Sequence, residues 1–392
     1  MPTSPIPQRP EWLALGGLLA LAAAMGIGRF VYTPILPFMA DSVPLGTGEA
    51  GLIASANFAG YLAGALAASI PALSGNPRVW FLAALLASAV TTAAMGASGS
   101  FGAFLALRFA GGLASAFVLV FASTLVLDRL RQAGRPDLFA LHFAGVGAGI
   151  ALSALMISAM ARSEAEWQTL WFVSGAATLG FCGLAAILTA GGPSGPTPSG
   201  AVSSAPSRPL RTRFDAALVR LIIAYGLFGF GYVITATFVS AMARTNPSLQ
   251  SAEPYVWLIV GLSAAPSIWV WNRVATRAGR KAALVAACLA EAAGVALTAI
   301  GSTPAVFSFG AGLVGGTFMG ITALGLVEAR ARVETRGGNT RQILALMTAS
   351  FGLGQMAGPT AAGIMHSVAG SFAAPSLAAA AALLIAAILF SR

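Results

Sequence analysis

Charged side chains are scarce in this sequence. Asp, Glu, Lys and Arg together make up 9% of the 392 residues, while hydrophobic residues make up 57%. Soluble proteins carry about 25% charged residues, which they need to cover a surface that faces water. A water-soluble fold of this length is therefore excluded.

Cysteine and histidine are nearly missing. Cys182 and Cys288 lie in separate apolar runs with no pattern of metal ligands around them, and there are two histidines. These counts exclude a disulfide framework and a zinc motif, and we expect neither a metal nor another cofactor. The ATP-binding Gly-x-x-x-x-Gly-Lys motif does not occur either. Because no nucleophile–base spacing is found, the protein is not expected to be an enzyme.

Long apolar runs fill most of the chain. A helix needs roughly 20 mostly apolar residues to cross a bilayer. The runs are continuous and rich in Ala and Leu, unlike the alternating segments of a membrane barrel. We therefore predict an all-α membrane protein with twelve transmembrane helices. The predicted spans are 11–38, 48–71, 78–98, 101–127, 136–160, 167–190, 216–243, 253–272, 281–300, 304–328, 340–366 and 371–390.

The basic residues indicate the orientation of these spans. With twelve spans, eighteen Lys and Arg residues fall on the side of the two termini, and Arg162 and Arg244 fall on the other side. Loops that stay in the cytoplasm retain Lys and Arg, so both termini are predicted to be cytoplasmic in a multi-pass protein of the cytoplasmic (inner) membrane. The net charge of +10 is thus a topology signal, and the lipid bilayer rather than nucleic acid is the expected partner. The first apolar run is too long for a signal-peptide core and should be retained.

One segment differs in composition from the rest. Residues 191–215 are rich in Gly, Pro, Ser and Arg, which is typical of a flexible linker. They divide the chain into an N-terminal six-helix bundle at 1–190, a cytoplasmic linker at 191–215 and a C-terminal six-helix bundle at 216–392.

The two halves resemble each other. Gly145-x-x-x-Gly149 recurs as Gly354-x-x-x-Gly358, and residues 25–30 match residues 228–233 at an offset of 203, which places Tyr232 opposite Arg29. Two pseudo-symmetric six-helix halves around a site at the middle of the membrane are typical of transporters that work by alternating access.

Three motifs give the chain a resemblance to the major facilitator superfamily over residues 11–390. They are Leu105-x-x-Arg108-x-x-Gly111-Gly112-x-Ala114, the loop Thr276-Arg277-Ala278-Gly279-Arg280-Lys281, and Gly354-x-x-x-Gly358-Pro359. They are similar to the membrane-embedded arginine motif, the gating loop and the Gly-Pro helix motif of that superfamily. Residues 25–34 together with 225–232 resemble its YbfB/YjiJ-type branch. The resemblance implies a secondary transporter, with gating residues Arg277, Arg280 and Lys281 in the gating loop. Asp128 and Glu328, which end equivalent helices next to cytoplasmic arginines such as Arg129, are predicted to be gating or anchoring residues.

Two arginines lie inside predicted spans, where an ionisable group costs a few kcal/mol and is a functional candidate. Arg29 and Arg108 both lie roughly 12–14 Å below the outer surface at 1.5 Å per residue. A guanidinium pair at one depth suits a carboxylate or phosphate, since each fork donates two parallel hydrogen bonds. The alternatives are that Arg108 is structural and bonds helix carbonyls, or that Arg29 reaches toward the outer headgroups.

Uncharged polar residues on neighbouring spans complete the predicted site. Tyr32 and Thr33 share a helix face with Arg29. The predicted substrate-binding residues are Arg29, Tyr32, Thr33, Asn57, Tyr61, Arg108, Tyr232, Thr235 and Gln355. For the uncharged ones, hydrogen bonds between helices are the alternative.

Three intramembrane residues are candidates for proton coupling: Glu291, His142 and Arg108. Burial favours the protonated form of a carboxyl, so Glu291 is suited to carry a proton. The alternatives are a structural hydrogen bond for Glu291 and a buried neutral imidazole for His142.

The sequence thus predicts a monomeric, proton-coupled secondary transporter for a small organic anion or zwitterion, such as a carboxylate or amino acid. An efflux pump for lipophilic drugs or metabolites is the alternative, and a membrane sensor is a weaker one. The two arginines favour an anionic substrate, because exporters of cationic drugs tend to place an acid early in the path.

Overall fold

The computed structural model describes residues 9–68, 70, 76–190, 215–335 and 338–392. These ranges are almost entirely helical and contain no strand. The predicted linker lies outside the described residues except for Asp215, which caps the following helix by accepting a hydrogen bond from the Leu218 amide at 2.9 Å.

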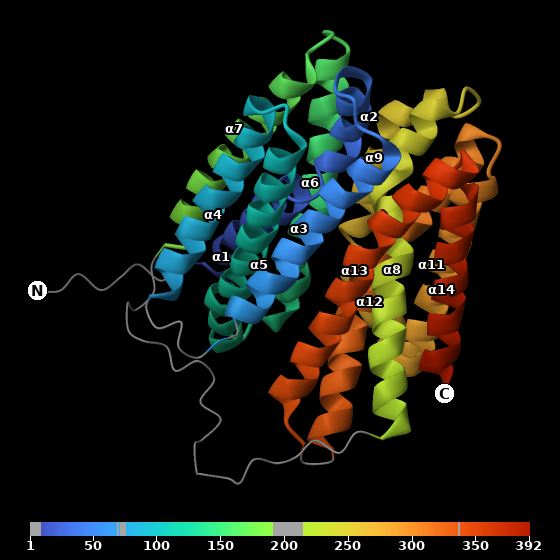
Figure 1. Cartoon of the computed structure of the whole chain (residues 1–392). Coiled ribbons are helices and arrows are strands. Elements are labelled where there is room, and N and C mark those ends of the chain that lie inside the picture. The colour runs from blue at the N-terminus through green and yellow to red at the C-terminus, as the bar shows by residue number, and fades with distance from the viewer. Residues whose placement is uncertain (1–8, 69, 71–75, 191–214, 336–337) are drawn as a thin grey trace, which may run out of the picture.

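The helices form two groups side by side, one from each part of the chain (Figure 1). The first group contains α1 (Pro10–Leu21), the π-helical segment η1 (Ala22–Ile27), α2 (Tyr32–Ser42), α3 (Thr47–Ala68), α4 (Pro77–Ala94), α5 (Phe101–Gln132), α6 (Phe139–Ala161) and α7 (Trp167–Leu188). The second contains α8 (Ala216–Thr245), α9 (Glu253–Ala264), α10 (Ser267–Ala278), α11 (Arg280–Ile300), α12 (Pro304–Glu334), α13 (Thr340–Ala369) and α14 (Ala373–Ser391).

The helices coincide with the predicted spans. Ten of the described helices are long and apolar enough to cross a membrane, or eleven if α9 and α10, which meet at a bend of 44°, are one span. The predicted span 340–366 corresponds to α13, which has 30 residues but is not among these candidates. The all-helical membrane fold is confirmed, whereas the count of twelve is not settled by length and composition.

The first span is broken near its middle. The amide of Gly28 bonds to the Ala23 carbonyl, five residues back, and the amide of Thr33 bonds to the Phe30 carbonyl, three residues back. Pro34 lacks an amide proton and so cannot continue the α-helical ladder. The carbonyls of Gly28 and Arg29 thereby lose their usual backbone partners in the middle of the membrane.

Glycines allow two helices to approach closely in each group. Two glycines of α6, four residues apart, lie against the backbone of α1 and the start of η1, and two glycines of α13 lie against the backbone of α8 in the same way. The pairs are Gly145 with Leu18, Gly149 with Ala22, Gly354 with Gly226, and Gly358 with Phe230. In these contacts the corresponding positions of the first span and α8 are 208 residues apart. The sequence match of residues 25–30 with 228–233 has an offset of 203 and stays a prediction.

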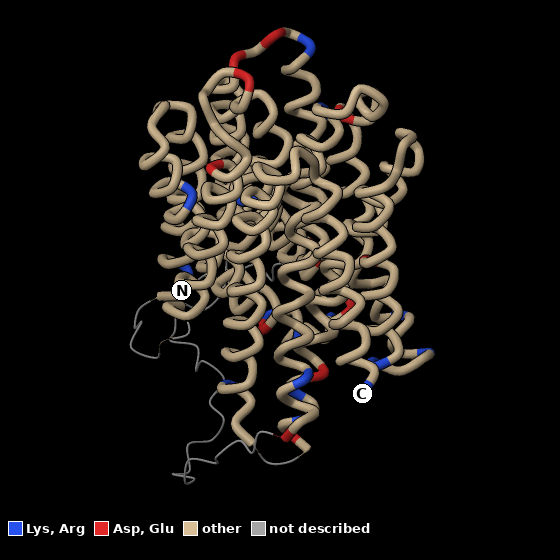
Figure 2. Tube along the Cα trace, turned by 45° about the vertical axis from the view of Figure 1, so that its right-hand side comes forward, with Lys and Arg blue, Asp and Glu red and all other residues tan. Residues whose placement is uncertain are grey.

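Contacts between the two groups concentrate toward one end of the bundle. Helix α3 packs against α13, α6 against α9 and α2 against α8. The hydroxyl of Ser55 donates to the Met356 carbonyl at 2.7 Å, and Arg244 forms an ion pair with Asp41 at 2.7 Å near the ends of α8 and α2. These ends lie away from the C-terminus, and basic residues gather toward the C-terminal end (Figure 2). The groups are therefore joined on the side opposite the C-terminus.

Close packing of α13 on α8 gives a first prediction. A side chain at position 354 would overlap the carbonyl of Gly226, so Gly354→Leu should lower the free energy of unfolding by about 1–3 kcal/mol or more. Thermal unfolding of the purified protein in detergent measures this. Gly180→Leu is the matched control, because a Cβ at Gly180 meets nothing within 4 Å. Equal melting temperatures for the two variants would contradict the packing.

Candidate functional site

Arg29 lies between the two groups of helices. It follows the π-helical segment, and its side chain is 3% exposed. One terminal nitrogen donates to Oε1 of Gln355 in α13 at 3.1 Å. The amide nitrogen of Gln355 in turn donates to the hydroxyl of Tyr232 in α8. The structure thus brings together three predicted site residues from distant parts of the sequence.

Aromatic rings surround the Arg29 guanidinium. Its carbon lies 4.1 Å from the ring centroid of Tyr61, 4.7 Å from that of Phe58 and 5.2 Å from that of Phe30. Cation–π attraction of this kind contributes about 2 kcal/mol or more where water is excluded. The rings therefore offset part of the cost of burying the charge.

Further rings close a circuit of contacts around this position. Phe30 meets Phe318 of α12 with centroids 6.4 Å apart, and Phe318 stacks on Tyr232 at 5.3 Å with 5° between the planes. Tyr232 returns to Arg29 through Gln355. We call these five residues, Arg29, Phe30, Tyr232, Phe318 and Gln355, the Arg29 cluster.

Arg108 makes different contacts from Arg29. It extends from α5, is 5% exposed, and donates to the carbonyls of Gly28 at 3.2 Å and Arg29 at 2.7 Å. These are the two carbonyls that the break in the first span leaves without their usual partners. Both terminal nitrogens of Arg108 are thus engaged with backbone next to Arg29. Its proposed share in a paired anion clamp stays a prediction.

The remaining polar candidates bond across helices. The amide of Asn57 donates to the Arg108 carbonyl at 2.9 Å, and Thr33 donates to the Ala236 carbonyl at 2.7 Å. Three further observations concern Tyr32 and Thr235: the Tyr32 hydroxyl donates to the Ala50 carbonyl at 2.9 Å, its ring lies under Arg108 at 5.1 Å, and Thr235 lies 3.5 Å from the Thr298 hydroxyl. These contacts match the alternative interpretation of interhelical bonds, and direct contact with substrate stays a prediction.

Glu291 is fully buried in the second group of helices. Neither carboxyl oxygen has a hydrogen-bond partner within 3.5 Å among the described residues. The side chains of Cys288, Thr317 and Tyr232 interact with it electrostatically. His142 lies in the first group, where its Nε2 is 3.5 Å from the Ser123 hydroxyl, and it is also fully buried.

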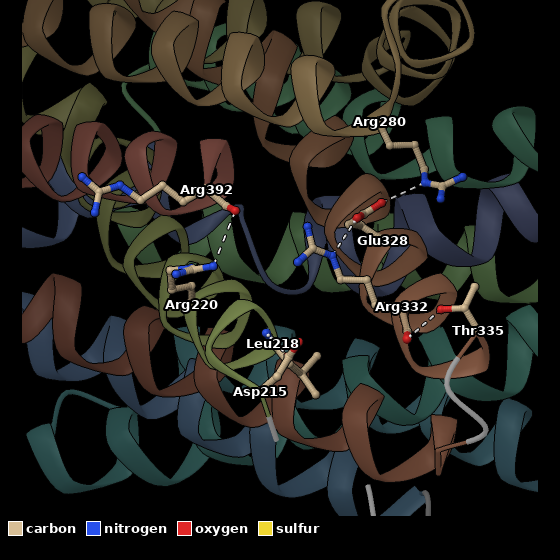
Figure 3. A network of polar contacts seen from close by, with 8 residues as sticks. All are labelled: Asp215, Leu218, Arg220, Arg280, Glu328, Arg332, Thr335 and Arg392. Atoms are coloured by element: carbon tan, nitrogen blue, oxygen red, sulfur yellow. Dashed lines mark hydrogen bonds and ion pairs between the residues drawn. The ribbon is translucent and has the colours of Figure 1, made fainter. Parts of the chain in front are cut away.

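Two predicted gating residues, Arg280 and Glu328, meet where α11 begins and near the end of α12. Glu328 accepts from Nε of Arg280 at 2.9 Å and from Nε of Arg332 at 2.8 Å (Figure 3). Gly279 has φ +86°, a left-handed conformation that favours glycine, and it turns the chain from α10 into α11 at Arg280.

The other gating candidates are dispersed. Asp128 pairs with Arg131 at 2.7 Å, and Arg129 donates to the Thr189 carbonyl at 3.2 Å. No hydrogen bond or ion pair is described for Arg277 or Lys281 within the described ranges. Their gating roles stay predictions.

A cavity of about 220 Å³ lies at the end of the bundle away from the C-terminus, between α2, α6, α8 and α9. Ser240 and Trp257 line it, and their polar side-chain atoms have no partner among the described residues. The Trp257 ring lies 6.4 Å from that of Phe30, so one wall of the cavity contacts the Arg29 cluster. The sequence contained no signal for this cavity.

None of the described residues forms a group of three or more His, Cys, Asp or Glu side chains that could hold a metal ion. None of the ion pairs among them includes Arg29 or Arg108. The site is therefore cationic and lined by aromatic rings, with contributions from both groups of helices.

A polytopic helical bundle with a buried cationic site between two helix groups is the architecture of a membrane transporter. Residues 21–391 match the family described as "Uncharacterised MFS-type transporter YbfB", and the chain belongs to this family of the major facilitator superfamily. The predicted resemblance is confirmed. A comparison with curated protein sequences finds no match.

Solved transporter structures share the fold. The crystal structure of the nucleoside transporter NupG (D323A mutant) superposes with a TM-score of 0.76 at 15% identity, covering 96% of this chain and 98% of that one. A bacterial homolog of the human lysosomal transporter Spinster, in an inward-facing and unoccupied conformation, gives a TM-score of 0.70 at 14% identity, covering 97% and 96%. At these identities the likeness shows the fold alone.

The contacts of Arg108 give a second prediction. Arg108→Ala should lower the free energy of unfolding by about 1–3 kcal/mol for each carbonyl left without a partner. Thermal unfolding in detergent measures the loss. Arg330→Ala is the control, because that side chain is exposed and pairs with Glu334 on the surface, and it should change stability by no more than about 0.5 kcal/mol. A melting temperature for Arg108→Ala as high as that of the control would contradict the structural role.

Proposed function

We propose that this protein is a proton-coupled secondary transporter that moves a small organic anion or zwitterion, such as a carboxylate or amino acid, by alternating access. The observation that carries the proposal is Arg29, a buried guanidinium between two groups of helices that has no ion-pair partner in the part of the chain that the structure describes. A buried charge without a counter-charge is costly. An anionic substrate supplies that counter-charge each time it binds.

The neighbours of Arg29 support a carboxylate in particular. Gln355 presents a neutral oxygen to the guanidinium at 3.1 Å. A carboxylate in its place accepts two hydrogen bonds, each charge-assisted and therefore stronger than the bond to an amide. Nε of Arg29, which has no partner among the described residues, is a further donor for that group.

Substrate bound at this position would touch both groups of helices. Arg29 belongs to the first group and Gln355 to the second, so a substrate between them replaces a contact that now joins the groups. In the proposed cycle the segments 1–190 and 216–392 are the two moving halves, connected by the cytoplasmic linker at 191–215. Rocking of the halves then exposes the site to either side of the membrane in turn.

The contacts between the halves support an inward-facing form of this cycle. Both termini are proposed to be cytoplasmic in the inner membrane, because basic residues gather on that side. Asp41 and Arg244 join the halves on the opposite, outer side at 2.7 Å, and Glu253 lies 3.6 Å from Arg244. This triad would have to separate before the site opens outward. The protein is proposed to work as a monomer, since each chain contains a whole site.

Transport assays on Arg29 variants test the proposal. Purified protein in liposomes is given radiolabelled acetate, succinate, alanine and benzoate in turn. We expect uptake of at least one of them, and we expect Arg29→Ala to reduce it more than tenfold, because a buried charge-assisted bond of about 1.5–3 kcal/mol is lost. Arg330→Ala is the surface control. Uptake by Arg29→Ala at the parent rate for every transported compound would contradict the proposal.

Glu291 is the proposed proton carrier. With the transported anion as probe, Glu291→Gln mimics the protonated carboxyl and should abolish accumulation driven by a pH gradient while leaving exchange of labelled for unlabelled substrate within about twofold of the parent rate. Glu334→Gln is the control, since that carboxyl is half exposed on the surface. Continued accumulation by Glu291→Gln under the same gradient would assign the proton to another group.

A further inference from the structure

We infer that the substrate is an aromatic monocarboxylate, that is, one carboxylate on a planar ring system. The inference rests on the proposed function, because it takes Arg29 as the group that binds the anion. It adds the charge of the substrate and the chemical nature of the group that carries the carboxylate.

The number of cationic side chains that are free to bind substrate determines the charge that the substrate can carry. Arg108 is the second guanidinium nearby, and both of its terminal nitrogens are engaged with the carbonyls of Gly28 and Arg29. The Arg29 cluster contains no other basic residue. A second carboxylate on the substrate would therefore enter a buried site without a partner, at a cost of several kcal/mol. One negative charge matches the site.

An ammonium group finds no matching partner in the cluster. Gln355 bonds to Arg29 and to Tyr232, and neither Gln355 nor Tyr232 carries a carboxylate. Glu291 has no hydrogen bond to any described residue, so its carboxyl does not bond to Arg29. A monoanion therefore fits the site better than a zwitterion.

The walls of the cluster are flat rings. Phe318 and Tyr232 are nearly parallel at 5.3 Å, and Phe351 lies parallel to Tyr232 at 6.0 Å, both with 5° between the planes. On the other side of Arg29, Tyr61 and Phe58 present their faces to the guanidinium. These five rings come from α3, α8, α12 and α13, and those of Tyr61 and Phe58 contact the cation directly.

Aromatic surfaces select for shape as well as for hydrophobic area. Offset stacking and edge-to-face contact add attraction beyond area burial, which an aliphatic chain of equal size does not obtain. A ring joined to a carboxylate would let the carboxylate displace Gln355 Oε1 from Arg29 while the ring reaches Tyr232 and Phe318. This arrangement uses four of the five residues of the cluster.

The test compares ligands that differ in one property at a time. Binding to the purified full-length protein is measured by thermal shift and by inhibition of benzoate uptake, using benzoate, phenylacetate, 1-naphthoate, cyclohexanecarboxylate and benzyl alcohol. We expect at least one of the three aromatic acids to bind about tenfold more tightly than cyclohexanecarboxylate, which has the charge without the aromatic face. Benzyl alcohol, which has the ring without the charge, should bind weakly.

Variants assign the preference to the rings of the cluster. Phe318→Leu should reduce the preference for benzoate over cyclohexanecarboxylate to about threefold or less while binding of cyclohexanecarboxylate changes little. Phe309→Leu on the same helix is the matched control, because Phe309 is 63% exposed on the outside of α12. It should leave the preference unchanged.

The outcomes separate the inference from the proposed function. Equal binding of benzoate and cyclohexanecarboxylate, both lost in Arg29→Ala, would overturn the aromatic inference and leave the anion transporter standing. Failure of all three aromatic acids to bind would overturn the inference as well. Transport of benzyl alcohol in preference to benzoate, with no effect of Arg29→Ala, would overturn both and favour export of neutral lipophilic compounds.

Discussion

The buried positive charge of Arg29, which has no ion-pair partner among the described residues, is the constraint on which the candidate site depends. Arg29 lies deep in an apolar bundle, and its guanidinium is held by one amide oxygen and the faces of three rings. These contacts are weaker than an ion pair, so the charge is retained at a cost. In the proposed mechanism that cost is offset by the substrate, which is why binding energy is available to move the two halves.

The break in the first span places this charge. The π-helical segment and Pro34 interrupt the helical ladder next to Arg29, and Arg108 donates to the two carbonyls that the interruption leaves open. Arg108 therefore acts on the site through the backbone that carries Arg29. Asn57 extends the connection by donating to the Arg108 carbonyl. Helices α5 and α3 thus hold the short turn at Gly28 and Arg29 in place at the interface between the groups.

The same residues serve packing and transport in the proposed cycle. Gln355 joins the halves through Arg29, while Tyr232 links Gln355 to the aromatic stack and to the neighbourhood of Glu291. In that cycle, a substrate anion that displaces Gln355 would free the Tyr232 hydroxyl from its hydrogen bond, and Tyr232 also interacts electrostatically with the proposed proton carrier. The anion and the proton would then act on the same side chain.

Much of the fold could be predicted from the sequence, since apolar length alone locates membrane helices. The predicted ends of two helices were too early, because hydropathy does not detect a helix that continues into charged residues. Helix α5 continues to Gln132 and α12 to Glu334, since their charged ends remain helical beyond the apolar run. The sequence match between the two halves stays a prediction, because single glycine coincidences are common in a chain with 46 glycines. The packing of glycine pairs against backbone relates the first span to α8 independently of that match.

The site could be predicted in part. A charge inside an apolar run is conspicuous, so Arg29, Arg108 and Glu291 were found, and the polar Gln355 was found with them. Phe30, Phe58 and Phe318 were not, because 23 phenylalanines are spread through the apolar segments and carry no individual signal. Their role depends on which helix faces meet at Arg29, and that follows from tertiary packing.

The central claim is that Arg29 binds the negative charge of the substrate. The most direct measurement compares the affinity for benzoate with that for benzamide, its uncharged analogue of nearly the same shape, in the parent and in Arg29→Gln. We expect the parent to bind benzoate more than tenfold more tightly than benzamide, and we expect Arg29→Gln to abolish this preference. A preference for benzoate that survives in Arg29→Gln would show that the anion is bound elsewhere.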